Sequence, residues 1–354
     1  MTDQDFEKAP DKDLPLRFEA MEFKVDRGQE PLRIDVYLVN KLEKISRSRI
    51  RSAADEGLLT VNKKKVKANY KVRPNDQVVL QVPRYHDDYV IEPEEMELDI
   101  IYEDDYLMVI NKPTGLVVHP GHGNYEGTLV HGLLYHFKIR NGIKPDPDMD
   151  IERLGLVHRL DKDTTGVMVV AKTAHSAEHL SKQFADRTTK RRYIALVWGE
   201  FHEESGTITG NIGRHPRNRL QNTVFVEGED GKHAVTHYTV LESLGYTSLI
   251  ECRLETGRTH QIRVHLQHIN HPVFGDPMYG GDKIVKGTVY SKYKQFVENC
   301  LTVLPRQALH AKNLGFEHPH TGEYHEYEAP LPEDFTTVLD KWRRYSGSLR
   351  DTNY

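Results

Sequence analysis

Cysteine is scarce in this chain of 354 residues, where only Cys252 and Cys300 occur. Two cysteines build neither a disulfide framework nor a cysteine-rich zinc site. Long apolar runs are missing as well, and no stretch approaches the roughly 18 residues that a membrane-spanning helix needs. The first residues are acidic and polar, without the basic and apolar regions of a secretory signal. These absences predict a reduced, cytoplasmic protein that does not enter a membrane.

Sequence motifs for common cofactors and metals are absent too. The chain has 20 histidines but neither H-E-x-x-H nor C-x-x-C, and it lacks the G-x-G-x-x-G of dinucleotide-binding folds. Four histidines crowd one segment, where we expect hydrogen-bonding or surface roles rather than a metal: His260, His265, His268 and His271. We therefore predict no metal site and no dinucleotide-binding fold.

The chain carries little net charge, since its formal total is only -5. This total conceals two blocks: residues 31–73 hold 12 Lys and Arg against 4 Asp and Glu, whereas residues 86–105 hold 10 Asp and Glu and no Lys or Arg. A basic block of this kind suits the phosphates of a nucleic acid.

The basic block has the pattern of a small separate module. Residues 1–30 predict a polar, loosely ordered leader. From Ile34 the apolar residues recur at helical spacing, and a second helix is expected to end at Gly57. Short strands follow over 58–61, 65–67 and 77–82, the first two around an Asn62-Lys63-Lys64 turn. We assign this module to residues 31–83.

An acidic linker over 84–98 separates the module from a larger domain over 99–335, and 336–354 is expected to form a C-terminal helix or tail. Strands and helices in the large domain follow no regular βαβ rhythm, which favours an α+β fold with a mixed, largely antiparallel sheet. The expected strands are 100–102, 106–110, 166–171, 192–198, 234–240 and 248–254; the expected helices are 128–137, 176–187 and 259–271, with a surface loop over 141–150.

Two polar stretches of the large domain are candidates for chemistry. The first, from Gly155 to Gly166, places Arg159 and Asp161 on a short loop between apolar segments, although a solvated surface turn would have a similar composition. The second, from Glu255 to His265, is a glycine turn that leads into a helix and places Arg263 near its start. An exposed helix of mixed charge is the alternative interpretation.

Taken together, several runs resemble the RNA pseudouridine synthases, in particular the RluA/RluD group of large-subunit ribosomal enzymes. The match extends from about residue 99 to residue 330. It is carried by Asn111-Lys-Pro-Thr-Gly-Leu-Val-Val-His-Pro-Gly, Gly155 to Thr173, Lys190-Arg-Arg-Tyr193, Leu254 to His265 and His271-Pro-Val-Phe-Gly-Asp-Pro-Met-Tyr-Gly.

This resemblance implies a role for each of four residues. Asp161 matches the catalytic aspartate, Arg263 the basic residue that pairs with it, Tyr193 the tyrosine that stacks on the target uracil, and Arg159 the arginine that fills the space of the flipped nucleotide. Uridine becomes pseudouridine by an internal rearrangement that needs no cofactor. An ionised Asp161 acts either as nucleophile at C1′ or as the base that removes the 2′ proton, and both alternatives stay open.

Residues 31–82 separately resemble the S4 RNA-binding module, with Asn62-Lys63 in place of the usual Asn-Gly of its hairpin. The RNA-binding candidates there are Arg47, Arg51, Lys63, Lys64 and Lys65. The implied partner is large-subunit rRNA or its assembly particle, most specifically the 23S rRNA hairpin called helix 69. A non-catalytic RNA-binding or ribosome-assembly protein is the alternative function.

Overall fold

The computed structural model describes residues 18–42, 47–83, 91–121, 124–140, 154–218, 220–225 and 230–351. The chain divides into two compact units, Met1–Val90 and Ile91–Tyr354. Each unit has its own apolar core. Within the described ranges, no helix is both long and apolar enough to cross a bilayer.

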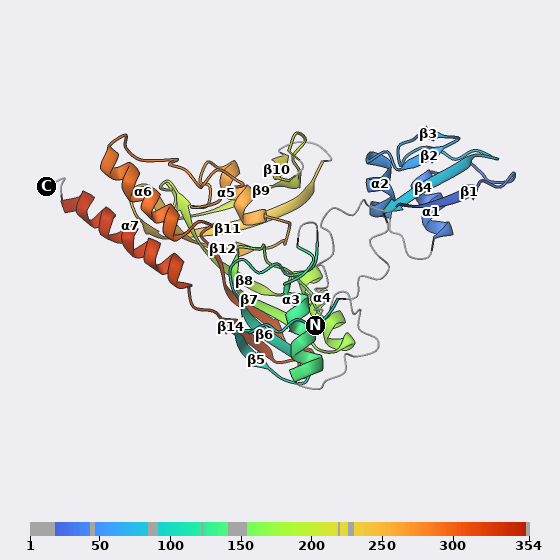
Figure 1. Cartoon of the computed structure of the whole chain (residues 1–354). Coiled ribbons are helices and arrows are strands. Elements are labelled where there is room, and N and C mark those ends of the chain that lie inside the picture. Colours follow the sequence, from blue (N-terminus) through green and yellow to red (C-terminus); the bar gives the residue numbers. More distant parts are fainter. Residues whose placement is uncertain are drawn as a thin grey trace, which may run out of the picture. The chain divides into compact units, whose positions relative to one another are not determined.

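The first unit packs two short helices, α1 (Ile34–Lys41) and α2 (Arg47–Asp55), on a four-stranded sheet. Its strand order is β1-β4-β2-β3, with β1 at Phe18–Lys24, β2 at Leu59–Val61, β3 at Lys64–Lys65 and β4 at Gln77–Pro83 (Figure 1). Ile34 and Leu38 of α1 and Ile50 of α2 are fully buried against this sheet. The small two-helix and hairpin unit expected from the sequence is therefore present.

Strand β1 corrects the expectation of a loosely ordered leader over residues 1–30. It pairs antiparallel with β4 over seven residues, from Phe18 opposite Pro83 to Lys24 opposite Gln77. Its partly buried residues, Met21 and Phe23, alternate with exposed ones and lead to the buried Val25, which is the period of a half-buried strand. The rest of the expected leader up to residue 17 lies outside the described residues.

The hairpin between β2 and β3 turns on two residues rather than the expected three. Asn62 (φ 50°) and Lys63 (φ 64°) both adopt the left-handed conformation, and Val61 pairs with Lys64. Two successive positive φ angles define the turn that matches the twist of a two-stranded ribbon. Lys63 occupies a position that glycine normally fills, and its side chain is exposed.

The second unit is built on one long, mostly antiparallel sheet of ten strands (Figure 1). The strand order is β10-β9-β11-β12-β8-β13-β7-β6-β5, with β14 on the free part of β13 and a single parallel pair, β13 with β7. The expected α+β class with a mixed, largely antiparallel sheet is confirmed. The strands are β5 (Ile100–Glu103), β6 (Leu107–Lys112), β7 (Thr165–Ala171), β8 (Lys190–Trp198), β9 (Ser205–Arg214), β10 (Asn222–Phe225), β11 (Lys232–Ser243), β12 (Thr247–Leu254), β13 (Leu309–Glu317) and β14 (Tyr324–Glu328).

Helices cover both faces of this sheet. Helix α3 (Leu129–Tyr135), which continues into a π-helical turn at His136–Arg140, shares a core with Met108 and Ile110 of β6. Helix α4 (Ala174–Asp186) packs on the opposite face, where Leu107 and Val109 point. Successive side chains of β6 thus point alternately into two cores, which explains why nearly every residue of the strand is buried. The expected loop over 141–150 lies outside the described residues.

Three further helices complete the unit: α5 (Gln261–His268), α6 (Ser291–Val303) and α7 (Glu333–Asp351). Helices α6 and α7 lie side by side, and Trp342 of α7 is fully buried against Trp198 of β8. The segment expected to form a C-terminal helix or tail is therefore a helix that packs on the main core. The acidic linker also ends earlier than expected, because Ile91 is buried in the second unit and Glu94 accepts a hydrogen bond from the backbone N–H of Gly127.

Candidate active site

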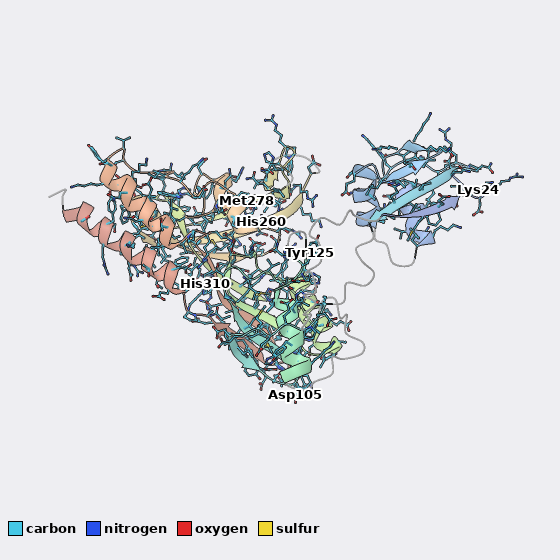
Figure 2. All side chains as sticks on the ribbon, viewed as in Figure 1. Lys24, Asp105, Tyr125, His260, Met278 and His310 are labelled. Atoms are coloured by element: carbon cyan, nitrogen blue, oxygen red, sulfur yellow. The ribbon has the colours of Figure 1, made fainter. Side chains whose placement is uncertain are left out.

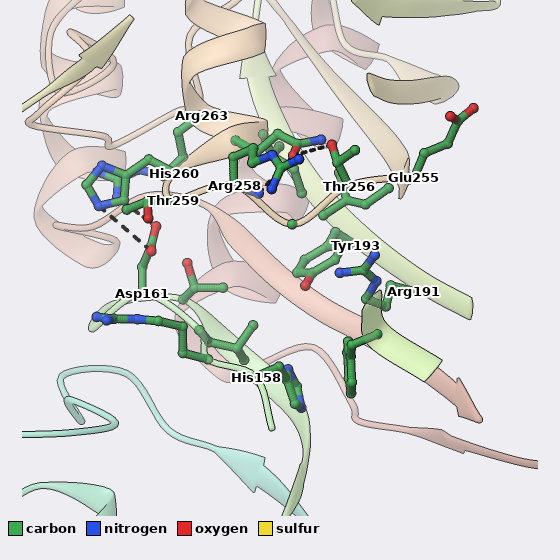
Figure 3. A pocket seen from close by; sticks show the side chains of 18 of the residues that line it. His158, Asp161, Arg191, Tyr193, Glu255, Thr256, Arg258, Thr259, His260 and Arg263 are labelled. Carbon is green, nitrogen blue, oxygen red and sulfur yellow. Dashed lines mark hydrogen bonds and ion pairs between the residues drawn. The ribbon is translucent and has the colours of Figure 1, made fainter. Parts of the chain in front are cut away.

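A pocket of about 380 Å³ lies over β8, near the middle of the long sheet. Its walls come from the loop that precedes β7, the end of α4, the pocket-facing residues of β8, and the turn between β12 and α5. Figure 3 shows this pocket. In Figure 2, the pocket residue His260 lies in the half of the unit that holds β9–β12, far from Asp105 in the turn between β5 and β6. The two polar stretches singled out in the sequence therefore face each other across one cavity.

Asp161 lies on the loop that precedes β7, and the main chain around it is tightly fixed. The backbone N–H of Thr164 donates to the carbonyl of Asp161 in a turn at 3.1 Å. Below the loop, the fully buried ammonium group of Lys112 donates to three carbonyl oxygens, including that of Lys162 at 2.8 Å. The guanidinium of Arg306 donates to the carbonyl of Asp163. Two buried basic side chains thus hold the loop that carries the carboxylate.

Gly155 at the start of this loop has no possible substitute. Its φ is +73°, and a Cβ atom there would lie 1.9 Å from the carbonyl oxygen of Ala171. The backbone of the loop therefore runs directly against the end of β7, and the N–H of Ala171 donates to the carbonyl of Gly155.

Arg263 joins Asp161 to a second, fully buried carboxylate. Its Nη1 donates to Oδ2 of Asp161 at 2.9 Å, while Nε and Nη2 donate to the two oxygens of Asp276 at 2.6 and 2.9 Å. Oδ1 of Asp276 also accepts from the backbone N–H groups of Met278 and Tyr279. The bidentate pair with Asp276 fixes the guanidinium plane, and the remaining nitrogen is aimed at Asp161.

The two carboxylates beside Arg263 keep its guanidinium charged. Burial acts to lower the pKa of Arg263, but the hydrogen bonds and charge of Asp276, followed by those of Asp161, outweigh it and raise the pKa above its ordinary value. One cation therefore lies between two carboxylates. Because Arg263 occupies Oδ2 of Asp161, Oδ1 remains available to a substrate. Among the described residues, the ring nitrogen Nε2 of His260 lies 3.8 Å from Oδ1.

His260 lies beside Asp161 and contacts Tyr279. His260 is the N-cap of α5, with a left-handed φ of 59° that is uncommon for a residue other than glycine. Its Nδ1 and the hydroxyl of Tyr279 are 2.9 Å apart, and the ring of Tyr279 lies 5.1 Å from the guanidinium of Arg263. Burial lowers the pKa of His260 more than the charge of Asp161 raises it, so the imidazole is neutral near pH 7.

Tyr193 and Arg191 project into the pocket from the same side of β8 (Figure 3). Burial raises the pKa of Tyr193; Arg191 acts to lower it and Asp161 to raise it, and the net shift is upward. The phenol is therefore protonated at neutral pH. Its hydroxyl has no hydrogen-bond partner among the described residues, and its ring forms part of the pocket wall.

The remaining predicted site residues fall into two groups. Arg159 is exposed at the pocket, and no ion pair engages it in the described part of the chain. In the first unit, Arg51, Lys63, Lys64 and Lys65 are exposed. Arg47 is exposed too, but its guanidinium donates to the fully buried Asp35 at 3.2 Å. Arg47 therefore has a structural partner besides any RNA.

Sequence reasoning missed Lys112, Asp276 and Tyr279 as parts of the site, although all three lie in the runs that carried the family resemblance. A buried lysine or aspartate has no distinctive sequence signal, because its partners come from distant segments. The histidines at 260, 265, 268 and 271 form no metal cluster within the described ranges, where no group of three or more His, Cys, Asp or Glu could hold an ion.

Comparison with known proteins defines the class of the protein. A family model described as RNA pseudouridylate synthase matches residues 106–268, and a model of the S4 domain matches residues 32–78. The first range contains Asp161, Tyr193 and Arg263. The second contains Arg47, Arg51 and the three hairpin lysines, Lys63, Lys64 and Lys65. The chain belongs to the RNA pseudouridine synthase family and is an RNA isomerase with an S4 domain. The resemblance noted in the sequence is thereby confirmed, and a non-catalytic RNA-binding protein is disfavoured.

Individual relatives cover nearly the whole chain. An uncharacterized RNA pseudouridine synthase of Chlorobaculum parvum is 46% identical over 325 residues, which span 91% of this chain and 98% of the relative. Ribosomal large subunit pseudouridine synthase D of Nitrosomonas europaea is 40% identical over 325 residues, 92% of this chain and 88% of the relative. Among solved structures, human RNA Pseudouridylate Synthase Domain Containing 4 is 28% identical, with a TM-score of 0.53 over 69% of this chain and 92% of that one.

Proposed function

We propose that this enzyme isomerises uridine in large-subunit rRNA, with Asp161 as its catalytic carboxylate. The observation that carries the assignment of Asp161 is its hydrogen bond to Arg263 at 2.9 Å, which fixes one carboxylate oxygen and leaves the other in the pocket. Arg263 and Asp276 act as positioning residues for that carboxylate. No other carboxylate in the described pocket wall is held in this way, since Glu255 is exposed and pairs with His237.

The reaction breaks the N1–C1′ bond of uridine and joins C5 of the same base to C1′, and the proton on C5 leaves. The bonding pair of the N1–C1′ bond departs with the base as uracilate. Asp161 supplies a carboxylate oxygen, either as nucleophile at C1′ or as the base that takes the 2′ proton. Both routes require the carboxylate beside the ribose, and the hydrogen bond from Arg263 orients it in the pocket.

Access to the target requires the nucleotide to leave its stack, which costs a few kcal/mol. The ring of Tyr193 in the pocket wall offers the base a stacking surface, and such stacking is worth about 1–3 kcal/mol. Arg159 is exposed at the pocket, and in this proposal it takes the space of the flipped nucleotide in the RNA. A neutral Tyr193 also keeps a second negative charge out of the pocket while Asp161 is ionised.

The substrate proposal rests on the relatives and on the S4 unit. Several curated relatives at 40–44% identity are named ribosomal large subunit pseudouridine synthase D. The exposed cations Arg51, Lys63, Lys64 and Lys65, with Arg47 beside them, suit the phosphates of structured RNA. We place the target in the 23S rRNA hairpin helix 69, and the enzyme where ribosomal subunits assemble.

A pseudouridine map of rRNA from cells that lack this protein tests the substrate. We expect one or more large-subunit sites to revert to uridine, to regain pseudouridine with the wild-type gene, and to stay uridine with Asp161→Asn. The matched control is Asp163→Asn, a change of the same chemistry two residues along the same loop, which should restore the sites. A complete large-subunit map in the deletion strain, with loss of a tRNA site instead, would overturn the rRNA assignment.

A further inference from the structure

Arg191 is a pocket residue in the Lys190–Tyr193 run of the family resemblance, but the resemblance gives it no role and it is not part of the charge network around Asp161. It lies two residues before Tyr193 on β8, so both side chains project from the same face of the strand. Figure 3 shows its guanidinium beside the ring of Tyr193. The intervening residue, Arg192, faces the other side and pairs with Glu326.

The Nε–H group of Arg191 is buried and has no hydrogen-bond partner. Among the described residues no carboxylate forms an ion pair with Arg191, whereas Arg263 has two such partners and Arg306 is paired with Asp334. A buried, charged donor that lacks an acceptor is strongly destabilising, so such a group takes its acceptor from water or from a ligand.

Neighbouring residues pack against the guanidinium of Arg191 without accepting a hydrogen bond from it. The ring of Phe184 lies 5.6 Å from its central carbon, within the range of a cation–π contact. Gly257, across the pocket, leaves room for it: a Cβ atom there would lie 3.0 Å from Nη1 of Arg191. The charge of Arg191 reaches the neighbouring rings, since it acts to lower the pKa of both His158 and Tyr193.

Two other arginines of the pocket are more exposed than Arg191, and the partly exposed Arg258 has an acceptor for its Nε, the carbonyl of His233. Arg159 and Arg187 are exposed at the pocket, where the phosphates of an RNA strand remain in solvent. Arg191 is only partly exposed, and its unpaired nitrogen is fully covered. Its Nη groups also have no hydrogen-bond partner among the described residues, and they are the donors that a substrate in the pocket can reach. A base stacked on Tyr193 would bring one edge within reach of Arg191.

We infer that Arg191 binds a carbonyl oxygen of the target uracil and stabilises the uracilate that forms when the N1–C1′ bond breaks. This inference rests on the proposed function. The electron pair of the broken bond is shared among N1, O2 and O4, so a guanidinium on a carbonyl oxygen gains strength as the bond breaks. The same contact disfavours cytosine if the oxygen is O4, because cytosine presents an amino donor there.

The test compares Arg191→Gln with Arg192→Gln, a neighbouring arginine outside the pocket. Full-length enzyme at saturating concentration is mixed with a large-subunit rRNA transcript tritiated at uracil C5, and release of tritium reports formation of the new C–C bond. We expect Arg191→Gln to slow release by about 100-fold, the usual effect of removing one donor to a developing anion, with RNA affinity within about twofold of wild type. Arg192→Gln should match the wild type in both.

Transcripts made with 4-thiouridine or 2-thiouridine identify the acceptor, because sulfur is a weaker acceptor than oxygen. One of the two should slow the wild-type enzyme, and that penalty should nearly vanish in Arg191→Gln, as a double-mutant cycle requires for a direct contact. Equal thio penalties in both enzymes would overturn the inference. So would a loss of affinity and a smaller salt slope without a change in rate, the result expected for a phosphate contact.

Gly257→Ala provides a second variant in case Arg191→Gln does not fold. The added methyl group displaces the guanidinium but retains its charge, and we expect a rate loss of at least about tenfold with an unchanged melting temperature. Gly347→Ala in α7 has open space around it and is the matched control. Wild-type rates in both Arg191→Gln and Gly257→Ala would refute the inference. If instead the wild-type enzyme releases no tritium from rRNA, the proposed substrate fails, and the same variants are then compared on tRNA transcripts.

Discussion

Replacement of Asp276 by Asn tests the buried ion pair that positions the active site. Asp276 is fully buried, and its two oxygens accept from Nε and Nη2 of Arg263. Removing one partner of a buried pair costs about 3–5 kcal/mol. Since Asn keeps one acceptor oxygen and Arg263 keeps Asp161, we expect the lower end, about 3 kcal/mol. For a unit of this size this corresponds to a fall in Tm of about 6–12 °C.

Activity should fall together with stability, because Arg263 loses the partner that fixes its plane. We expect tritium release at saturating RNA and 25 °C, where the variant is still folded, to slow at least tenfold. The matched control is Asp340→Asn, which removes an exposed carboxylate from an i,i+3 pair with Arg343 and should shift Tm by less than about 2 °C. If Asp276→Asn melts and reacts like Asp340→Asn, the buried pair does not position the site.

Three further predictions concern pH, salt and metals. Burial, and then the charge of Arg191, lower the pKa of His158 to about 3, against about 6.5 in the unfolded chain, so stability should fall as pH drops from about 6.5 towards 3. Urea titrations at several pH values give the slope of the unfolding free energy against pH. In His158→Gln this slope should be reduced by up to about 1.4 kcal/mol per pH unit, and a slope equal to that of the wild type would contradict a neutral His158. Changing Lys63, Lys64 and Lys65 to Gln should reduce the slope of log K against log salt for rRNA binding by up to about 3, whereas an unchanged slope would remove the hairpin from the RNA interface. Activity should survive EDTA when Mg²⁺ is kept high enough to fold the RNA; a loss restored by zinc would show a metal site.

Periodicity and charge sufficed to predict much of the architecture, but not the edges of each unit. The α+β class, the small basic module and most central strands followed from local patterns. Strand β1 was missed although Met21, Phe23 and Val25 alternate with polar residues, because its register depends on pairing with β4, more than 50 residues away. A helix or tail was expected over 336–354, and only the packing of α7 on β8 shows that Trp342 belongs to the core.

The site was predictable only in part, for a related reason. Local composition marked the loop of Asp161 and the turn before Arg263, but their contact spans 102 residues and was implied by the family resemblance alone. The residues that orient Arg263 and hold the loop of Asp161 could not be predicted. Asp276 has no sequence feature that distinguishes a buried carboxylate from a surface one, and the burial of Lys112 depends on carbonyl groups from another segment.

Tritium release by Asp161→Asn tests the central claim most directly. Asn keeps the shape of the side chain and removes the charge that acts on the ribose, so RNA binding should persist while release from C5-tritiated large-subunit rRNA stops. Asp163→Asn, on the same loop, should release tritium at close to the wild-type rate. Release by Asp161→Asn at a tenth of the wild-type rate or faster would contradict the assignment of Asp161 as the catalytic carboxylate.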